Sequence, residues 1–190
     1  FRGITQSAGD PALQASIDYA HDSGFYAGAW ASNIDFGDDD NGGIGDVEVD
    51  LYAGWTGSTE SGLGYSLNAV YYTYPGADLD IDGDSFSLDF PEISAGISYK
   101  VFSAKLWYSW DFANSDLDAT YLEGNLNFTL PHDFGLAIHA GYSSGDYWDA
   151  LDDADAGAPY FDYSVGVTKT LGHFNLALKF IDGSDLEALD

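Results

Sequence analysis

The 190-residue sequence contains no cysteine and only five lysine and arginine residues. Without cysteine, the chain has neither a disulfide framework nor a thiolate metal site. The scarcity of bases excludes nucleic acid as an ordinary partner, because Lys and Arg are needed to neutralise phosphates. The chain also lacks an apolar run near the roughly 20 residues that span a bilayer as a helix. Only a closed barrel of strands therefore remains as a way to cross a membrane.

Acidic residues, glycine and tyrosine are abundant instead. The chain has 32 Asp and Glu, a net charge of −27, 23 Gly and 14 Tyr. Turn-forming glycines and β-favouring aromatics are typical of many short strands within one domain. The negative charge has three interpretations: the surface of a halophile's protein, a cation-binding surface, or loops that face a salty exterior.

Ten segments of alternating apolar and polar residues predict the strands. In one of them, Val47, Val49 and Leu51 share a face, and Glu48 and Asp50 occupy the other. The segments lie at 13–19, 25–33, 47–55, 63–74, 92–100, 102–110, 122–130, 136–144, 160–170 and 174–180.

The connections between these segments alternate between short and long. The short ones lie at 22–24, 57–62, 100–101, 131–135 and 171–173, and the long ones at 34–46, 75–85, 111–119 and 145–159. Most acids fall in the long connections and the C-terminal tail, whereas four of the five bases lie near short turns or on the last strand. This pattern predicts an all-β, antiparallel up-and-down barrel with short turns at one end and long acidic loops at the other. A sandwich would need crossovers instead.

We expect a single barrel domain over residues 1–190. Residues 1–11 would hold the end of a preceding strand and a loop, and residues 182–190 an acidic tail or loop. Both ends would then lie on the long-loop side, whereas such barrels usually have both termini on the short-turn side. We therefore expect about twelve strands in the complete barrel. Since position 1 is not Met, we also expect that a secretory signal peptide has been removed.

Several blocks of the sequence resemble the TorF family of porins, which is also catalogued as a conserved hypothetical family of Gram-negative bacteria. The similar blocks are 1–6 (FRGITQ), 9–14 (GDPALQ), 19–33 (YAHDSGFYAGAWASN), 47–55 (VEVDLYAGW), 121–125 (YLEGN) and 163–180. This resemblance covers nearly the whole chain. It implies an outer-membrane β-barrel with a signal peptide and terminal strands outside this sequence.

Charged side chains on the more polar strand faces are candidates for the wall of a pore. They are Asp18, Glu48, Asp50, Glu92, Lys105, Glu123, His139, Asp162 and Lys179. Around a lumen they would line a cation-preferring passage. An internal salt-bridge network that fills a narrow barrel is the alternative. The opposite face cannot carry them, because a charge at the bilayer midplane costs roughly 2–4 kcal/mol.

One long connection has the spacing of a calcium loop. Asp78, Asp80, Asp82 and Asp84 alternate around Gly83, and Asp89 stands where such a loop has its last ligand. A solvated acidic loop is the alternative interpretation. Weaker calcium candidates are the run 38–42 and the cluster Asp149, Asp152, Asp153 and Asp155.

Aromatic and histidine residues bear on where the protein lies rather than on a reaction that it catalyses. Aromatic residues near strand ends favour interfacial girdles over ordinary cross-strand packing. We predict no enzyme, because His139 with a neighbouring Ser or Asp is the sole catalytic candidate and no fixed spacing supports it. His21, His132 and His173 lie in short turns, where contact with water or headgroups is favoured over a shared metal.

The preferred hypothesis is an outer-membrane barrel, in contact with lipid, that passively passes small polar or cationic solutes. The alternative is a structural subunit of a surface or extracellular filament, tube or layer. Such a subunit would form a homo-oligomer or polymer through its barrel edges and its acidic loops, bridged by Ca²⁺. A halophile's soluble β-protein comes third, because its outward apolar rows would need a packed partner.

Overall fold

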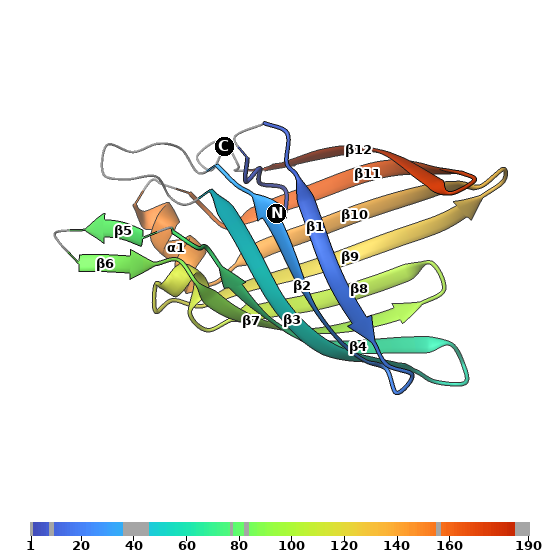
Figure 1. The fold of residues 1–190 in the computed structure, drawn as a ribbon, viewed down its shortest axis with the longest axis horizontal. Helices are drawn as coiled ribbons and strands as arrows, with labels where there is room; N and C mark the ends of the chain where they lie inside the picture. The colour runs from blue at the N-terminus through green and yellow to red at the C-terminus, as the bar shows by residue number, and fades with distance from the viewer. Residues whose placement is uncertain are drawn as a thin grey trace.

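One antiparallel sheet of ten strands forms the body of the protein (Figure 1). The computed structural model describes residues 2–7, 10–35, 46–76, 78–81, 84–154 and 157–184, with the backbone alone for 78–81 and 84–86. The strands of the sheet are β1 (Gln14–Ala20), β2 (Phe25–Asn33), β3 (Val47–Ser58), β4 (Leu63–Thr73), β7 (Phe90–Tyr99), β8 (Phe102–Ser109), β9 (Ala119–Leu130), β10 (Phe134–Ser144), β11 (Tyr160–Leu171) and β12 (Phe174–Ser184).

The strands follow one another in the up-and-down order β1-β2-β3-β4-β7-β8-β9-β10-β11-β12, with the separate β5–β6 pair inserted between β4 and β7. The predicted all-β, antiparallel class is therefore confirmed, and the ten predicted segments correspond to these ten strands. Tight turns join alternate pairs. Lys100, for example, has a left-handed φ of 55° between β7 and β8, a conformation that two-residue hairpin turns require.

The two faces of the sheet differ in polarity. Apolar side chains point outward and stay exposed, as Leu67 (58%), Leu106 (47%) and Leu122 (54%) show. On the opposite face, Glu48 and Glu92 are each only 1% exposed. This arrangement is the reverse of a water-soluble globule, in which large apolar side chains are the buried ones. In the part of the chain that the structure describes, no second sheet covers the outward apolar rows.

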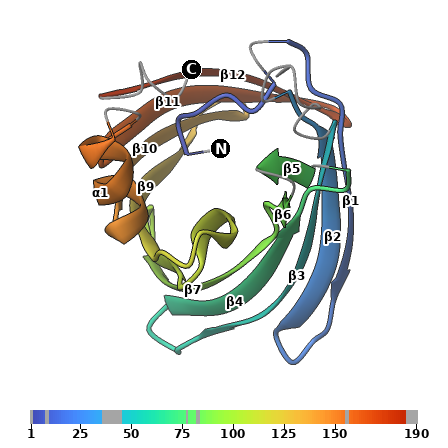
Figure 2. The same cartoon turned by 90° about the vertical axis from the view of Figure 1, so that its left-hand side faces the viewer.

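The sheet curls around a central space, which we call the lumen (Figure 2). The ten strands do not close into a barrel over the residues described, and a complete barrel of about twelve strands stays a prediction. β1 and β12 are the outer strands of the sheet and do not pair with each other over the residues described. Strand twist accumulates across the sheet, so that β1 crosses the view of Figure 1 steeply whereas β12 runs nearly along the long axis.

The long connections contain short elements that the sequence analysis treated as loop. They are the two-stranded β5 (Asp78–Ile81) and β6 (Asp84–Ser87), the 3₁₀ turn η1 (Phe112–Asn114) and the helix α1 (Asp146–Asp153). Among the described residues, no helix is long and apolar enough to span a membrane.

An aromatic cluster lies at the end of the sheet that carries the long connections. The ring of Phe112 in η1 lies 4.6 Å from that of Phe90 and 5.8 Å from that of Trp148 in α1. The Trp148 ring in turn lies 5.0 Å from that of Tyr160. All four residues are buried. This cluster packs η1 and α1 against the strands at that end, and the N-terminal segment enters the lumen (Figure 2).

Candidate functional site

The candidate site is the inward-facing surface of the sheet, which we call the interior face. The structure places all nine predicted wall residues there. Glu48 and Glu92 are buried, and Asp18, Asp50 and Lys105 line one interior cavity. Glu123, His139, Asp162 and Lys179 line a second one. The period-2 alternation brings these residues together because every second side chain of a strand points to the same face.

Arg2 enters the lumen and binds Glu92 of β7. Its Nη2 atom lies 2.7 and 2.6 Å from the two carboxylate oxygens, and Tyr72 of β4 donates a hydrogen bond of 3.0 Å to the same carboxylate. The guanidinium also stacks on Tyr121, 4.6 Å from the ring centroid. The buried carboxylate is thus satisfied by a cation and a hydroxyl, as a charge in a low-dielectric interior requires.

His139 of β10 is the centre of a second polar network. Its Nε2 atom lies 3.0 Å from Asp162 and 2.9 Å from the Tyr121 hydroxyl, and its Nδ1 atom lies 2.8 Å from the amide oxygen of Asn125. Glu123 lies 3.6 Å from Nδ1. Because both ring nitrogens face oxygen atoms, the imidazole is fixed in orientation by four neighbours.

This network borders a cavity of about 720 Å³, which we call the main cavity. Both acidic groups (Glu123 and Asp162) and basic groups (Arg2, His139 and Lys179) line it. The aromatic rings of Tyr72, Trp107 and Tyr121 form part of its wall. The main cavity therefore offers hydrogen-bonding and charged groups of both signs, with flat apolar surfaces between them.

The lumen has smaller residues toward the short turns. A cavity of about 270 Å³ there is lined mainly by glycine, serine and threonine, including Gly64, Ser66 and Ser98, together with Lys105. Toward the long connections the interior is filled by large rings. Tyr74, just beyond β4, donates a hydrogen bond of 3.4 Å to Glu48, and burial raises the pKa of the Tyr74 hydroxyl. The interior therefore contains larger side chains near the long connections than near the short turns.

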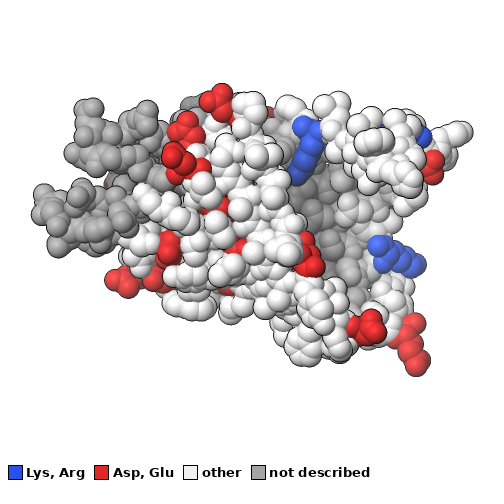
Figure 3. All heavy atoms as spheres, viewed as in Figure 1, with Lys and Arg blue, Asp and Glu red and all other residues white. Residues whose placement is uncertain are grey.

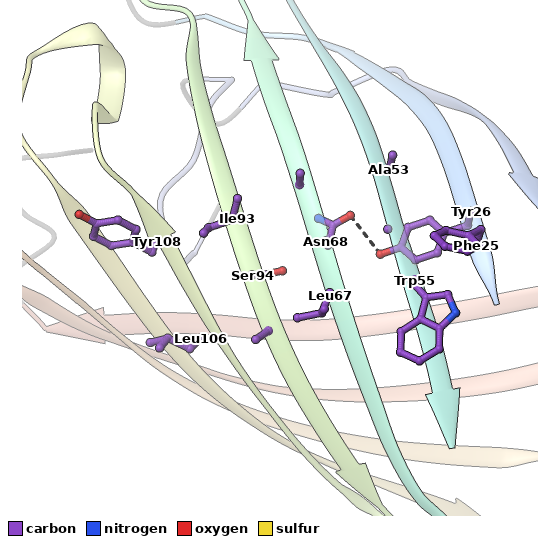
Figure 4. A pocket seen from close by; sticks show the side chains of 13 residues that line it. Phe25, Tyr26, Ala53, Trp55, Leu67, Asn68, Ile93, Ser94, Leu106 and Tyr108 are labelled. Carbon is purple, nitrogen blue, oxygen red and sulfur yellow. Dashed lines mark hydrogen bonds between the residues drawn. The ribbon is translucent and has the colours of Figure 1, made fainter. Parts of the chain in front are cut away.

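The outer face carries a hollow of a different kind. A groove of about 640 Å³ runs over β2, β3, β4, β7 and β8, where alanines stand between larger apolar side chains (Figure 4). Phe25 and Trp55 lie toward one edge of the groove, Leu67 near its middle, and Leu106 and Tyr108 toward the other edge. On the interior side of the same strands, the Tyr26 hydroxyl donates a 3.0 Å hydrogen bond to Asn68. Such an exposed apolar hollow is suited to contact with other apolar groups.

Charge is distributed unevenly over the surface (Figure 3). On the face shown, carboxylates gather toward the long connections and at the tips of turns, and the surface between them is largely uncharged. The space-filling view also shows a hollow between the β11–β12 hairpin and the hairpins formed by β1 to β4.

The predicted calcium loop falls mostly outside the description. Asp82 is not among the described residues, and the side chains of Asp78, Asp80 and Asp84 are not described either. Asp89 accepts a 2.8 Å hydrogen bond from the backbone of Tyr74. The run 38–42 and Asp155 also lie outside the described residues. Within the described part, no group of three or more acidic or histidine residues is arranged to hold a metal ion. Calcium binding stays a prediction.

For the catalytic candidate His139, the structure shows a contact with an aspartate but, over the described residues, none with a serine hydroxyl. His139 does meet an aspartate, Asp162, but its remaining partners are Tyr121, Asn125 and Glu123. No serine hydroxyl bonds to His139 in the part of the chain that is described. Arg2 was missed as a site residue, because an ion pair between residues 90 positions apart leaves no local pattern.

Comparison with known proteins identifies the family of this chain but indicates no activity. Neither the curated proteins nor the solved structures contain a match to this chain. The model of one family, described as "Bacterial protein of unknown function (Gcw_chp)", matches residues 1–189. The chain therefore belongs to this bacterial family of unknown function.

Proposed function

We propose that the chain is an outer-membrane β-barrel of the porin type, similar to the TorF family, that passes small polar or cationic solutes. The observation that carries the proposal is the inverted polarity of the sheet, with exposed leucines such as Leu67 and Leu106 outside and buried carboxylates such as Glu92 and Asp162 inside. A membrane barrel needs this arrangement, because lipid surrounds it and water fills it.

The preference for cations follows from the charges on the interior face. Six of the nine wall residues are acidic: Asp18, Glu48, Asp50, Glu92, Glu123 and Asp162. Arg2 neutralises Glu92, and His139 lies beside Asp162. The remaining carboxylates attract cations into the lumen and repel anions. The aromatic cluster and the Arg2 segment restrict the passage to small solutes.

The proposal requires that the outer edges of β1 and β12 be paired in the membrane. Unpaired backbone groups in the hydrocarbon region cost several kcal/mol each. Direct contact between the two edges or added strands would both meet this requirement. Added strands correspond to the barrel of about twelve strands expected from the sequence.

Planar-bilayer recording tests the proposal. The purified chain in detergent should give discrete conductance steps, and a KCl gradient should give a reversal potential on the cation-selective side. Loss of cation preference in Asp50→Asn, with preference kept in the exposed-turn control Glu60→Gln, would locate selectivity in the lumen. A chain that stays monomeric in water without detergent and gives no conductance would refute the proposal.

Over the residues described, the outer edges of β1 and β12 pair with no other strand. This favours a second candidate, a structural subunit that polymerises edge to edge. Such a subunit should sediment as a polymer without detergent. If Ca²⁺ bridges the acidic loops, EDTA should disperse the polymer. A monodisperse particle in detergent that EDTA leaves unchanged would exclude this candidate.

A further inference from the structure

Among the described residues, one buried hydroxyl that borders the main cavity has no hydrogen-bond partner. It belongs to Ser164 of β11, which is only 2% exposed and lies on the interior face among the residues that line this cavity. Its direct cross-strand neighbours are His139 of β10 and Ile181 of β12, and the His139 ring bonds to other side chains. Because a buried hydroxyl needs a hydrogen-bond partner, Ser164 offers one polar contact to a molecule in the cavity.

A lysine stands beside this hydroxyl. Lys179 of β12 pairs with Gly166, which is the next inward-facing residue of β11 after Ser164. The stem of the lysine lies close to that glycine, since a Cβ atom built on Gly166 would be 3.5 Å from the Cγ atom of Lys179. In the described part of the chain, the Lys179 ammonium forms neither a hydrogen bond nor an ion pair. Lys179 and Ser164 can therefore both donate hydrogen bonds to a carboxylate.

The same cavity also contains a carboxylate without a permanent cation beside it. Glu123 of β9 accepts hydrogen bonds from the Trp107 indole (3.0 Å) and the Asn125 amide (3.3 Å), and its side chain is 18% exposed. Both donors are neutral, so the negative charge remains. Lys105 is its cross-strand neighbour on β8 but lies over the Trp107 ring, and no lysine or arginine of the described chain forms an ion pair with Glu123. Glu123 can therefore accept a hydrogen bond from an ammonium group.

The other charged groups that line the main cavity already have charged or titratable partners. Arg2 binds Glu92, and Asp162 lies 3.0 Å from the Nε2 atom of His139. One positive and one negative side chain, the lysine on β12 and the glutamate on β9, remain available to a ligand over the residues described. A ligand with a single charge would pair with one of them, whereas a zwitterion pairs with both.

The distance between these two groups bears on the length of the ligand. Glu123 and Lys179 lie on strands that are three places apart in the sheet, and neighbouring strands are about 4.8 Å apart. Although both side chains project into the lumen and shorten this gap, the two charges of one ligand must be separated by a spacer. Ala137 and Ile181 add apolar surface to the cavity wall, and its volume of about 720 Å³ suits a small organic molecule. A short methylene chain meets both conditions.

We propose that the main cavity binds ω-amino carboxylates, which are zwitterions with a short methylene chain between an ammonium and a carboxylate. The ligand carboxylate accepts hydrogen bonds from Lys179 and Ser164, and the ligand ammonium donates hydrogen bonds to Glu123. The inference rests on the proposed function, because a solute reaches this cavity through the lumen. It identifies the class of polar solute that the passage retains.

Isothermal titration of the full chain in detergent with 6-aminohexanoate tests the site, with the heat of titration into protein-free micelles subtracted. One equivalent should bind at least about tenfold more tightly than hexanoate or n-hexylammonium, because each of these analogues lacks one charged end. Lys179→Gln and Glu123→Gln should each weaken the binding of 6-aminohexanoate by at least about tenfold. The matched controls Lys100→Gln and Glu60→Gln, both on exposed turns, should leave it unchanged. Circular dichroism would establish that each variant keeps its sheet. If either charge variant fails to fold, Ser164→Ala provides a second test and should also weaken binding.

Three outcomes would overturn the inference: no binding of 6-aminohexanoate, equally tight binding of either one-charge analogue, or unchanged affinity in every cavity variant that folds. Bilayer recording separates this failure from that of the proposed function. Conductance without binding of 6-aminohexanoate removes the site and leaves the pore. Binding without conductance removes the pore and leaves the site.

Discussion

Arg2 and Glu92 form an ion pair inside the lumen, with Nη2 2.6 Å from the nearer carboxylate oxygen. Their side chains are 10% and 1% exposed. The pair holds the segment that precedes β1 against β7, although three strands of the sheet (β2, β3 and β4) lie between β1 and β7. Because residues 2–5 also line the main cavity, the pair holds this segment inside the lumen.

Replacing Glu92 with Gln should release the N-terminal segment. The guanidinium would lose a buried anion, and breaking one partner of such a pair costs about 3–5 kcal/mol in the free energy of unfolding. Urea unfolding in detergent micelles would measure this loss, and trypsin should then cleave after Arg2. In the double variant Arg2→Gln/Glu92→Gln, part of the stability should return. Resistance of Glu92→Gln to trypsin at Arg2 would contradict the role given to the pair.

Gly141 should not tolerate a side chain, because a Cβ atom there would lie 2.0 Å from the hydroxyl of Tyr121. That hydroxyl is held by Asp162 and His139. Gly141→Ala should therefore lower the free energy of unfolding by about 1–3 kcal/mol, as overpacking does. Gly124 is a matched control in the adjacent strand, because a Cβ there meets nothing within 4 Å. Equal free energies of unfolding for Gly141→Ala and Gly124→Ala would contradict this prediction, because they would show that Tyr121 moves aside without a loss of stability.

Leu106→Arg distinguishes a lipid-facing surface from a water-facing one. Leu106 points outward from the middle of β8 and is 47% exposed. In bilayers, an arginine there should lower the free energy of unfolding by about 2–4 kcal/mol. In water, a surface substitution of this kind changes stability by less than about 0.5 kcal/mol. Glu60→Arg, on an exposed turn, is the control and should be neutral in both media. If Leu106→Arg left the free energy of unfolding in bilayers unchanged, the result would argue against a lipid-facing position for this side chain.

Tyr147 should make the fold sensitive to alkaline pH. Burial in α1 raises the pKa of this hydroxyl above the model-compound value of 10.0. The unfolded chain therefore loses the proton first as pH increases, so stability is complete below about pH 10 and declines above it. Phenolate absorbance recorded with circular dichroism should show a tyrosine that ionises only as α1 unfolds. Tyr147→Phe should remove this step, and ionisation of Tyr147 in the intact fold would disprove its burial.

Much of the strand pattern could be predicted from the sequence, because the side-chain period of a strand is two and one face of each segment is apolar. Glu48 and Asp50 were placed on the inner face of their strand for this reason. The helix at Asp146–Asp153 was missed, since its four aspartates obscure the spacing of Trp148 and Leu151. The alternation does not predict how the outer edges of β1 and β12 are paired. Side-chain alternation determines which face of the sheet is apolar. It does not determine the tilt of the strands or the number of strands at which a sheet closes into a barrel.

Pairing of every strand with its neighbour along the chain has a consequence for assembly. Each hairpin can form from adjacent segments, without waiting for a distant partner, so the entropy lost in closing each loop is small. The Arg2–Glu92 contact is different, because it joins positions separated by 90 residues. We therefore expect the N-terminal segment to dock late, after the strands of the sheet have paired.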